Sequence, residues 1–387
     1  MYWFYSATIM LILSLIEKGA YRKVVYKLSL FVFFIIISGS YYNGIDWINY
    51  VKHYEEIYNN GFPTDYLPYE PGFVFLMYFF ASIIKVSNFQ IIVLSVSLAF
   101  TYTLHLFIKK IDWEFNRSAL LLLILLFLLP LFNDAVRQLA AMAVILPFLP
   151  RINSISLKKL IVIVLLSSLF HASSILLIPI FLLIRYPLRK RRIIYYALSS
   201  VCFVILFVSL PFVISIIGSF IPAIFYAKLT GYVSKLDGGF KFGLFMIIDL
   251  VGIIITLLLS EKFKNDKQMV LSTTASFIFF LLHLLFYMTP FLQRLLYYIF
   301  PLVGVYSLVS FRVGRFSHLN RMTFPIVAIM CLGVFYRNVT NPYYSYDFDK
   351  PKFFYFELLN NDYPNLNDLK SGKCSVIDQF DPTFCPI

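Results

Sequence analysis

The feature that most constrains this chain is a succession of long apolar runs separated by short polar segments. A membrane-spanning helix needs roughly 20 mainly apolar residues, with about 17–25 usual. The runs therefore predict an all-α, polytopic membrane protein with about ten transmembrane helices plus re-entrant segments. They lie at residues 2–16, 28–40, 71–86, 89–108, 118–132, 135–150, 160–184, 193–217, 243–260, 269–287, 295–311 and 322–337.

The composition excludes a soluble fold. Hydrophobic residues make up 60% of the 387 residues and charged residues 14%, whereas charged residues are about 25% of a typical soluble domain. We expect one multi-span membrane domain over residues 1–340, with outer loops at 41–70 and 218–242. An extracytoplasmic C-terminal tail should follow at 341–387.

The net charge of +13 is distributed unevenly. Of the 33 Lys and Arg residues, 21 lie in six short segments between apolar runs, and these segments hold only 5 of the 20 acidic residues. Short loops rich in Lys and Arg stay in the cytoplasm, so the charge indicates topology and not nucleic-acid binding. The segments are 17–27, 109–117, 151–159, 185–192, 261–267 and 312–321.

Two runs do not fit a simple topology. If all six basic segments are cytoplasmic, both termini lie outside and the run 71–86 must dip into the membrane and return. The run 160–184 is too short for two crossings. We therefore expect two re-entrant half-helices with their apex near Phe170 and His171, and one long tilted helix is the alternative. Broken helices at membrane depth line cavities and often mark substrate sites.

Carboxylates and aromatic rings gather on the predicted outer side. Asp46 and Glu70 are flanked by rings that include Trp47 and Tyr50. Rings stack on sugar faces and carboxylates accept hydrogen bonds from hydroxyls, so the carboxylates are catalytic candidates and the rings are sugar-binding candidates. An interfacial aromatic belt beside ordinary loop acids is the alternative.

Two arginines begin helices on the outer side, where the positive-inside bias removes most basic residues. A helix N-terminus attracts anions, and the guanidinium fork suits phosphate. Arg137 and Arg294 together predict a diphosphate clamp, and Tyr297 adds a candidate sugar-binding ring. For Arg137 the alternative is a structural ion pair with Asp134, a residue that could also be the N-cap of the helix. For Arg294 the alternative is contact with lipid headgroups.

His171 lies at the predicted apex of the run 160–184. A histidine there can bind phosphate or act as a base, whereas a helix-packing histidine is the alternative. The sequence has no Walker motif, no nucleophile elbow and no metal-type Cys/His spacing. Neither a metal site nor nucleotide-driven pumping is therefore predicted.

The four cysteines divide into two pairs. Cys202 and Cys331 lie in apolar runs and are expected to be inert packing residues. Cys374 and Cys385 lie in the polar tail, where an oxidising outer compartment favours a disulfide between them.

The candidate residues fall into short motifs that resemble the EpsG branch of the Wzy-type polysaccharide polymerases, over residues 40 to 300. The resemblance implies a GT-C-like fold in a bacterial inner membrane, with the active site facing outward. The motifs are Gly44-Ile45-Asp46 with spaced tyrosines, Tyr69-Glu70-Pro71-Gly72-Phe73, Val136-Arg137-Gln138-Leu139-Ala140, Leu169-Phe170-His171-Ala172-Ser173, and Arg294 with Tyr297.

The resemblance implies transfer of a growing glycan from undecaprenyl diphosphate to a sugar hydroxyl of the next lipid-linked repeat unit, as in O-antigen, capsule or exopolysaccharide synthesis. Glu70, Asp46 or His171 would act as base, and Arg137 and Arg294 would bind the diphosphate. The donor carries its own leaving group, so no cofactor is required. The partners are the lipid-linked oligosaccharide and membrane lipid, without nucleic acid, and a chain-length regulator is left open.

Three other functions compete with this one. A flippase of the lipid-linked sugar would place charges along a path through the bilayer, and Asp249 is the exception that fits it. A polymer ligase shares the same arginine chemistry. A membrane acyltransferase would use a single catalytic histidine and would leave the outer arginines without a task.

Overall fold

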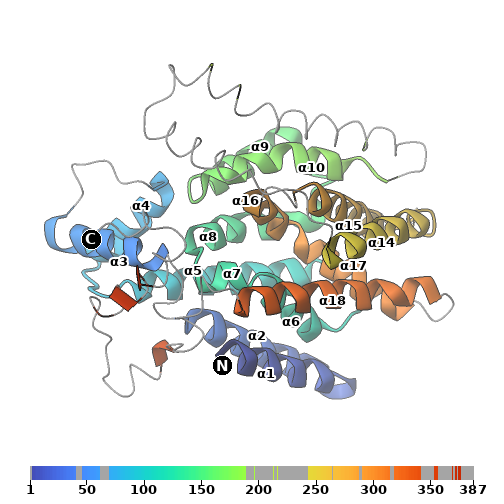
Figure 1. The fold of residues 1–387 in the computed structure, drawn as a ribbon, viewed down its shortest axis with the longest axis horizontal. Coiled ribbons are helices and arrows are strands. Elements are labelled where there is room, and N and C mark those ends of the chain that lie inside the picture. The colour runs from blue at the N-terminus through green and yellow to red at the C-terminus, as the bar shows by residue number, and fades with distance from the viewer. Residues whose placement is uncertain are drawn as a thin grey trace. The chain divides into compact units, whose positions relative to one another are not determined.

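The computed structural model describes residues 2–40, 46–61, 69–188, 243–263, 265–286, 290–313, 318–340 and 353–355, with single residues 196, 212, 216, 368, 371, 372, 374 and 375. Regular structure in these residues is helical, apart from an isolated bridge between Ser40 and Phe353 (Figure 1). The all-α fold class is confirmed.

Most helices are shorter than a bilayer is thick. Within the described ranges, three are long and apolar enough to span a membrane, at Gln90–Lys109, Lys267–Leu285 and Asn320–Val339. The helices are α1 Tyr2–Ile16, α2 Arg22–Ser38, α3 Asp46–Asn60, α4 Pro71–Tyr78, α5 Gln90–Lys109, α6 Arg117–Phe127, α7 Leu129–Asn133, α8 Val136–Ile145, α9 Leu157–Ser168, α10 Leu177–Arg185, α14 Leu244–Ser260, α15 Lys267–Leu285, α16 Pro290–Gln293, α17 Phe300–Val313 and α18 His318–Val339.

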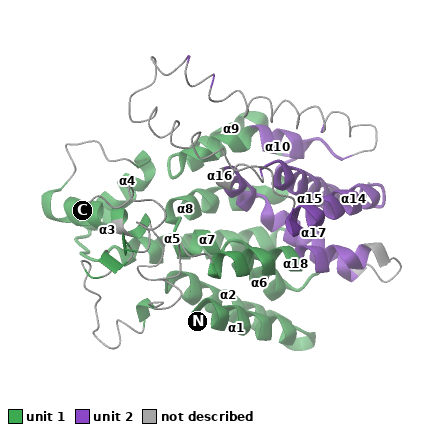
Figure 2. Cartoon of the chain, viewed as in Figure 1, with its two compact units in different colours: residues 1–151, 155–178, 328–387 green, residues 152–154, 179–327 purple. Residues whose placement is uncertain are grey.

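The chain forms two compact units (Figure 2). Unit 1 comprises residues 1–151, 155–178 and 328–387, and unit 2 comprises 152–154 and 179–327. Unit 1 contains α1 to α9, and unit 2 contains α14 to α17. The polar motifs before residue 178 therefore belong to unit 1, whereas Arg294 and Tyr297 belong to unit 2.

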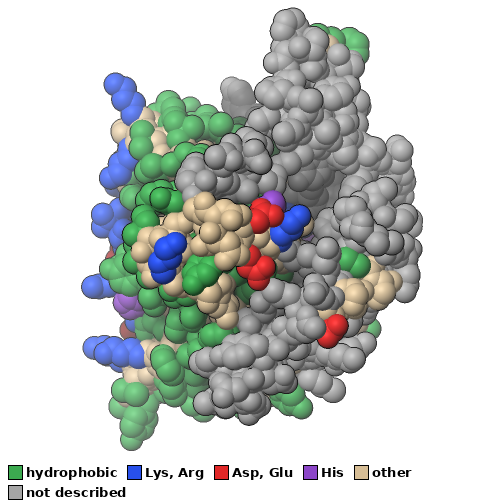
Figure 3. Space-filling model, turned by 90° about the vertical axis from the view of Figure 1, so that its left-hand side faces the viewer, with side chains coloured by type: hydrophobic (Ala, Val, Ile, Leu, Met, Phe, Trp, Pro, Cys, Tyr) green, Lys and Arg blue, Asp and Glu red, His purple; other side chains and the backbone are tan. Residues whose placement is uncertain are grey.

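Helix α5 shows why these helices belong in a membrane. Ile92, Val96 and Phe100 recur at every fourth residue and are buried against unit 1, as expected for one face of a helix. Leu98 and Tyr102 point the other way and are 59% and 60% exposed. Hydrophobic side chains also cover much of the described surface in Figure 3. Such a surface is stable against lipid and costly against water, so the chain is a membrane protein.

Helices α2 and α5 run antiparallel and define two ends of unit 1. At one end, Gln90 Nε2 donates to the carbonyl of Ser38 over 2.7 Å. Near the other end, Tyr26 Oη lies 3.0 Å from His105 Nδ1. A 17-residue helix such as α2 is about 25 Å long, so the two ends are separated by most of a membrane's hydrocarbon thickness.

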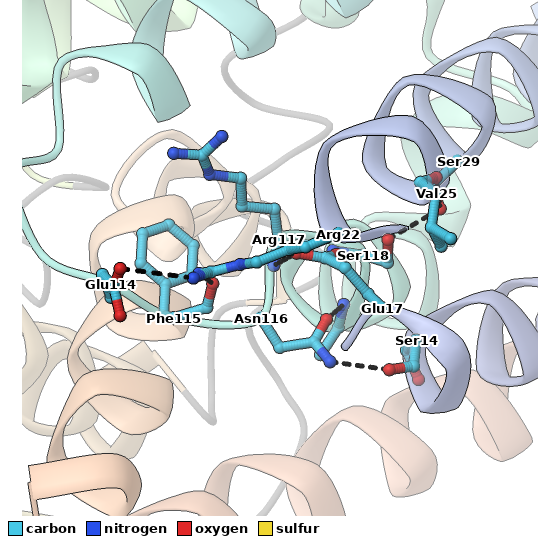
Figure 4. Close-up of polar contacts among 11 residues, drawn as sticks. Ser14, Glu17, Arg22, Val25, Ser29, Glu114, Phe115, Asn116, Arg117 and Ser118 are labelled. Carbon is cyan, nitrogen blue, oxygen red and sulfur yellow. Dashed lines mark hydrogen bonds and ion pairs between the residues drawn. The ribbon is translucent and has the colours of Figure 1, made fainter. Parts of the chain in front are cut away.

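At the Arg22 end of unit 1, a buried carboxylate connects the segment before α2 to the start of α6 (Figure 4). Glu17 accepts hydrogen bonds from the first backbone N–H groups of α6, at Arg117 (3.1 Å) and Ser118 (2.6 Å). Arg22 Nε lies 3.5 Å from Glu17, and the same guanidinium reaches Glu114. The predicted cytoplasmic segments 17–27 and 109–117 are therefore in direct contact, which agrees with their predicted placement on one side.

The run 160–184 is broken where the sequence predicted an apex. Helix α9 ends at Ser168, and a 3-10 helix, Ala172–Leu176, follows before α10. Ser167 Oγ donates to Ser174 Oγ over 3.0 Å, so the chain folds back on α9. With 12 residues, α9 is about 18 Å long, too short to cross a bilayer of about 30 Å. The re-entrant topology itself stays a prediction.

The predicted outer loop 41–70 contains a helix, α3, that the sequence did not predict. Helix α3 packs against α4 and the π-helix Phe79–Ile83 that continues it. Tyr54 Oη donates to the Val86 carbonyl over 2.7 Å, and Ser82 Oγ donates to the Ile57 carbonyl. Helix α3 is thereby fixed at the Gln90 end of α5.

Helices α14 and α15 pack closely in unit 2. Gly252 permits the contact, because a Cβ atom there would lie 2.7 Å from the Phe280 ring. Asp249 Oδ2 and His283 Nδ1 lie 2.7 Å apart, and both side chains are buried. The acidic residue that stood out in its apolar run thus has a partner on the neighbouring helix.

Parts of the predicted outer surface lie outside the described residues, including loop 218–242 and most of the tail. Cys331 is buried and free. Cys374 is disulfide-bonded, but Cys385 is not described, so their pairing stays a prediction.

Candidate functional site

The site is built around the junction between α7 and α8. Helix α7 ends at Asn133, whose Oδ1 accepts a hydrogen bond from Trp3 Nε1 over 3.2 Å. Asp134 and Ala135 leave the helical conformation before α8 begins at Val136. Arg137 therefore lies in the first turn of α8, at a helix N-terminus, as the sequence predicted.

Arg137 forms an ion pair with Glu70. Its Nη1 atom lies 2.8 Å from Glu70 Oε2, and the two side chains are 19% and 15% exposed. Glu70 stands directly before α4, which begins with Pro71, a residue suited to the first helical position. The pair joins two motifs that are 67 residues apart in the sequence.

Tyr50 holds the other side of the guanidinium. Arg137 Nε donates to Tyr50 Oη over 3.0 Å, and Tyr50 Oη donates to Asp46 Oδ2 over 3.0 Å. The guanidinium carbon also lies 5.6 Å from the centre of the Tyr50 ring and 5.0 Å from that of Tyr69, within cation–π range. Arg137 Nη2 has no hydrogen-bond partner in the described part of the chain.

The turn after α9 supplies the third side of the site. The Ala172 backbone N–H donates to Glu70 Oε1 over 3.0 Å, and His171 Nδ1 lies 3.8 Å from the same oxygen. The Gly72 N–H donates to the Leu169 carbonyl over 2.8 Å. A Cβ atom on Gly72 would lie 2.7 Å from that carbonyl oxygen, so only glycine allows this approach.

The surroundings of Glu70 favour its charged form. Partial burial opposes the charge, but the Arg137 guanidinium, the Ala172 N–H and the nearby His171 outweigh burial and lower the pKa of the Glu70 carboxyl. A carboxylate held in this way is a weak proton acceptor. Glu70 is therefore better suited to orienting Arg137 than to removing a proton.

Asp134 has a different role from either one suggested by the sequence. It is not the N-cap of α8; that position is Ala135. The ion pair of Arg137 is with Glu70, whereas Asp134 Oδ1 accepts a hydrogen bond from the backbone N–H of Asp46 over 2.7 Å. Asp134 thus stabilises the start of α3.

Two of the three aromatic residues predicted to bind sugar, Trp47 and Tyr50, lie inside the protein. Trp47 and Tyr50 are each 1% exposed. The Trp47 ring packs edge-on against Phe89, and the Tyr50 ring contacts Phe73 and Phe89. Sugar binding by these rings stays a prediction.

Unit 2 holds the two remaining site candidates. Arg294 is exposed and begins a 3-10 helix that ends at Tyr298, and Tyr297 is 9% exposed.

Two residues of unit 1, Tyr69 and Gly72, had no predicted role, although both lie in the same motif as Glu70. Within the described ranges, no group of three or more His, Cys, Asp or Glu residues could hold a metal ion.

The cluster consists of Asp46, Tyr50, Glu70, Arg137 and His171, drawn from α3, the start of α4, the start of α8 and the turn after α9. We refer to it as the outer cluster. Figure 3 shows acidic, basic and histidine side chains gathered together on one face of the molecule. The outer cluster is the candidate functional site of an all-helical membrane protein.

Comparison with known proteins identifies the family. The model of the EpsG family matches residues 24–348, and the chain belongs to that family. The suspected resemblance is confirmed, and the chain is of the polysaccharide-polymerase type. No curated protein and no solved structure matches it.

Proposed function

We propose that the chain is an extracytoplasmic polymerase that transfers a growing glycan from undecaprenyl diphosphate to a sugar hydroxyl of the next lipid-linked repeat unit. The observation that carries this proposal is the meeting of three separate motifs at one carboxylate: Glu70 of one motif is contacted by Arg137 and His171 from two others. Glycosyl transfer from a lipid diphosphate needs a cation for the leaving group and a base for the acceptor hydroxyl.

The roles follow from the contacts. Arg137 stabilises the diphosphate through its available Nη2 donor while Glu70 and Tyr50 hold the other two nitrogens. His171 accepts the proton of the acceptor hydroxyl as the new bond to the anomeric carbon forms. The bond from that carbon to the diphosphate oxygen breaks, and the electron pair leaves with the diphosphate. Diphosphate binding by Arg294, which belongs to unit 2, stays a prediction from the sequence.

The position of the outer cluster in unit 1 supports an active site outside the cytoplasm. Basic segments 17–27 and 109–117 lie at one end of α2 and α5, whereas Tyr50 packs on Phe89 at the other end. If the basic end is cytoplasmic, the cluster faces the opposite surface of the membrane. In this proposal that surface belongs to a bacterial inner membrane.

A deletion strain tests the proposal. Cells lacking the protein should accumulate surface glycan with a single repeat unit, and the long polymer seen on a gel should return with the native gene. Purified protein in liposomes should then lengthen lipid-diphosphate-linked repeat units extracted from that strain. Failure of both assays contradicts the proposed function.

One observation favours a transporter of the same lipid-linked oligosaccharide as the second candidate. Asp249 and His283 form a buried ionisable pair between α14 and α15, and ionisable groups inside membrane helices often line transport paths. A transporter mutant would present almost no repeat units outside the cell, whereas a polymerase mutant would present single units.

A further inference from the structure

Tyr50 differs from the other residues of the outer cluster because its side chain is wholly inside the protein. It is 1% exposed, and its ring lies against Tyr69, Phe73 and Phe89. A ring covered in this way has no free face to present to a pyranose. The hydroxyl group, by contrast, has two partners.

The direction of these two hydrogen bonds is fixed by chemistry. An arginine nitrogen can only donate, so Tyr50 Oη accepts from Arg137 Nε. Its single proton is then donated to Asp46 Oδ2, one helical turn earlier on α3. The Asp134 carboxylate in turn accepts from the Asp46 N–H. A continuous hydrogen-bonded chain therefore runs from the α7–α8 junction through α3 to the guanidinium.

The guanidinium is consequently held at defined points. Nε is bound to Tyr50, Nη1 is bound to Glu70, and the rings of Tyr50 and Tyr69 lie beneath the charge. A planar group fixed at two of its three nitrogens cannot rotate, so the direction of the third nitrogen is determined by the protein.

We infer that Tyr50 is a positioning residue: its hydroxyl fixes Arg137 so that Nη2 points to the diphosphate leaving group. This inference rests on the proposed function. It replaces sugar stacking with a role exerted through Arg137, and it predicts that transfer depends on the Tyr50 hydroxyl and not on contact between the ring and a sugar.

The first experiment compares two tyrosines of the same helix. Tyr50→Phe should lower the rate of repeat-unit transfer in liposomes about tenfold, as expected for the loss of one hydrogen bond to a charged group. The apparent KM for the acceptor unit should change less than about twofold, because binding of the acceptor is not affected. Tyr54→Phe is the matched control: it also removes a buried hydroxyl, bonded to Val86, and should keep near-native activity.

The second experiment asks whether Tyr50 acts through Arg137. In an Arg137→Lys background, which lacks the Nε donor, Tyr50→Phe should cost less than about twofold. An equal tenfold cost in both backgrounds overturns the inference. So does a loss of activity that matches a loss of folded protein, measured as the melting temperature in detergent beside Tyr54→Phe.

The same cycle separates the inference from the proposed function. If Arg137→Lys transfers repeat units as fast as the native protein, the diphosphate role of Arg137 is wrong, whatever Tyr50 does. If Arg137→Lys is impaired and Tyr50→Phe is not, only the positioning role is wrong.

Discussion

Two of the arginine–carboxylate contacts described in unit 1 lie near opposite ends of α2 and α5, and they differ in what surrounds them. Glu17 contacts Arg22 at one end, and its side chain is fully buried. Glu70 contacts Arg137 at the other end, and both side chains remain partly exposed. The two contacts use the same residue types at opposite surfaces of one helical bundle.

The surroundings decide the role of each contact. Glu17 accepts hydrogen bonds from two backbone N–H groups at the start of α6, so its carboxylate stabilises contacts within the fold. Arg22 adds one ion pair to this carboxylate. Glu70 instead receives a side chain from each of two other motifs, and Nη2 of its partner Arg137 makes no hydrogen bond to the described residues. A carboxylate whose hydrogen bonds are made within the fold stabilises the helices. An arginine with a nitrogen outside these contacts can also bind a ligand.

The largest effect should distinguish the two arginines. Arg137→Ala should abolish polymer while leaving the protein in the membrane, because losing a charged contact to a developing diphosphate costs a few kcal/mol, roughly a hundredfold or more in rate. Arg22→Ala should lower stability by only about 1 kcal/mol and leave activity per molecule intact. Surface polysaccharide gels and membrane immunoblots measure both. Full-length polymer from Arg137→Ala would remove the basis of the comparison.

The two carboxylates should show the reverse pattern. Glu17→Ala leaves the Arg117 and Ser118 N–H groups buried without their acceptor and should cost about 2–4 kcal/mol of stability. Glu70→Gln should melt near the native temperature and lose most of its activity, because the amide cannot hold Arg137 by charge. Thermal melts in detergent, with activity expressed per folded molecule, test this. A larger loss of stability in Glu70→Gln than in Glu17→Ala would contradict it.

Substitution of Gly72 or Gly252 should have effects of intermediate size. Gly72→Ala forces Leu169 away and should lower transfer about tenfold, since overpacking typically costs 1–3 kcal/mol and here displaces the turn that carries His171. Gly252→Ala introduces a similar clash with Phe280 in unit 2 and should lower the melting temperature without a comparable loss of activity per folded molecule. Equal activity losses in the two variants would show that the effect is not specific to the site.

The smallest effect concerns pH. The lowered pKa of Glu70 means that its ion pair is fully present above the ordinary glutamate range and is lost only as pH falls through the lowered value. The pair should therefore remain intact from pH 5 to 8, and Glu70→Gln should not shift the activity profile in that window. A profile of the residual activity of Glu70→Gln tests this. A shift of that profile between pH 5 and 8 relative to the native protein would contradict the prediction.

Much of this molecule could be predicted from apolar periodicity alone. The run 89–108 became α5, and the break near His171 appeared where the run was too short for two crossings. The Arg137–Glu70 pair could not be predicted, because nothing in a single sequence relates two positions 67 residues apart. Helix α3 was missed because its hydrophobicity is low and its buried side is made of aromatic residues that also suit an interfacial loop. The role of Glu17 could not be predicted either, because its burial depends on its contacts with the start of α6.

The hydrogen bond from Gly72 to the Leu169 carbonyl has a consequence for the evolution of these proteins. Any larger side chain at residue 72 would need the turn at 169–172 to move away, and that movement would also take the Ala172 N–H from Glu70. The motif that contains Gly72 and the turn at 169–172 are therefore expected to change together. Across homologues we expect a residue other than glycine at this position to occur only together with a change in the length or sequence of the turn.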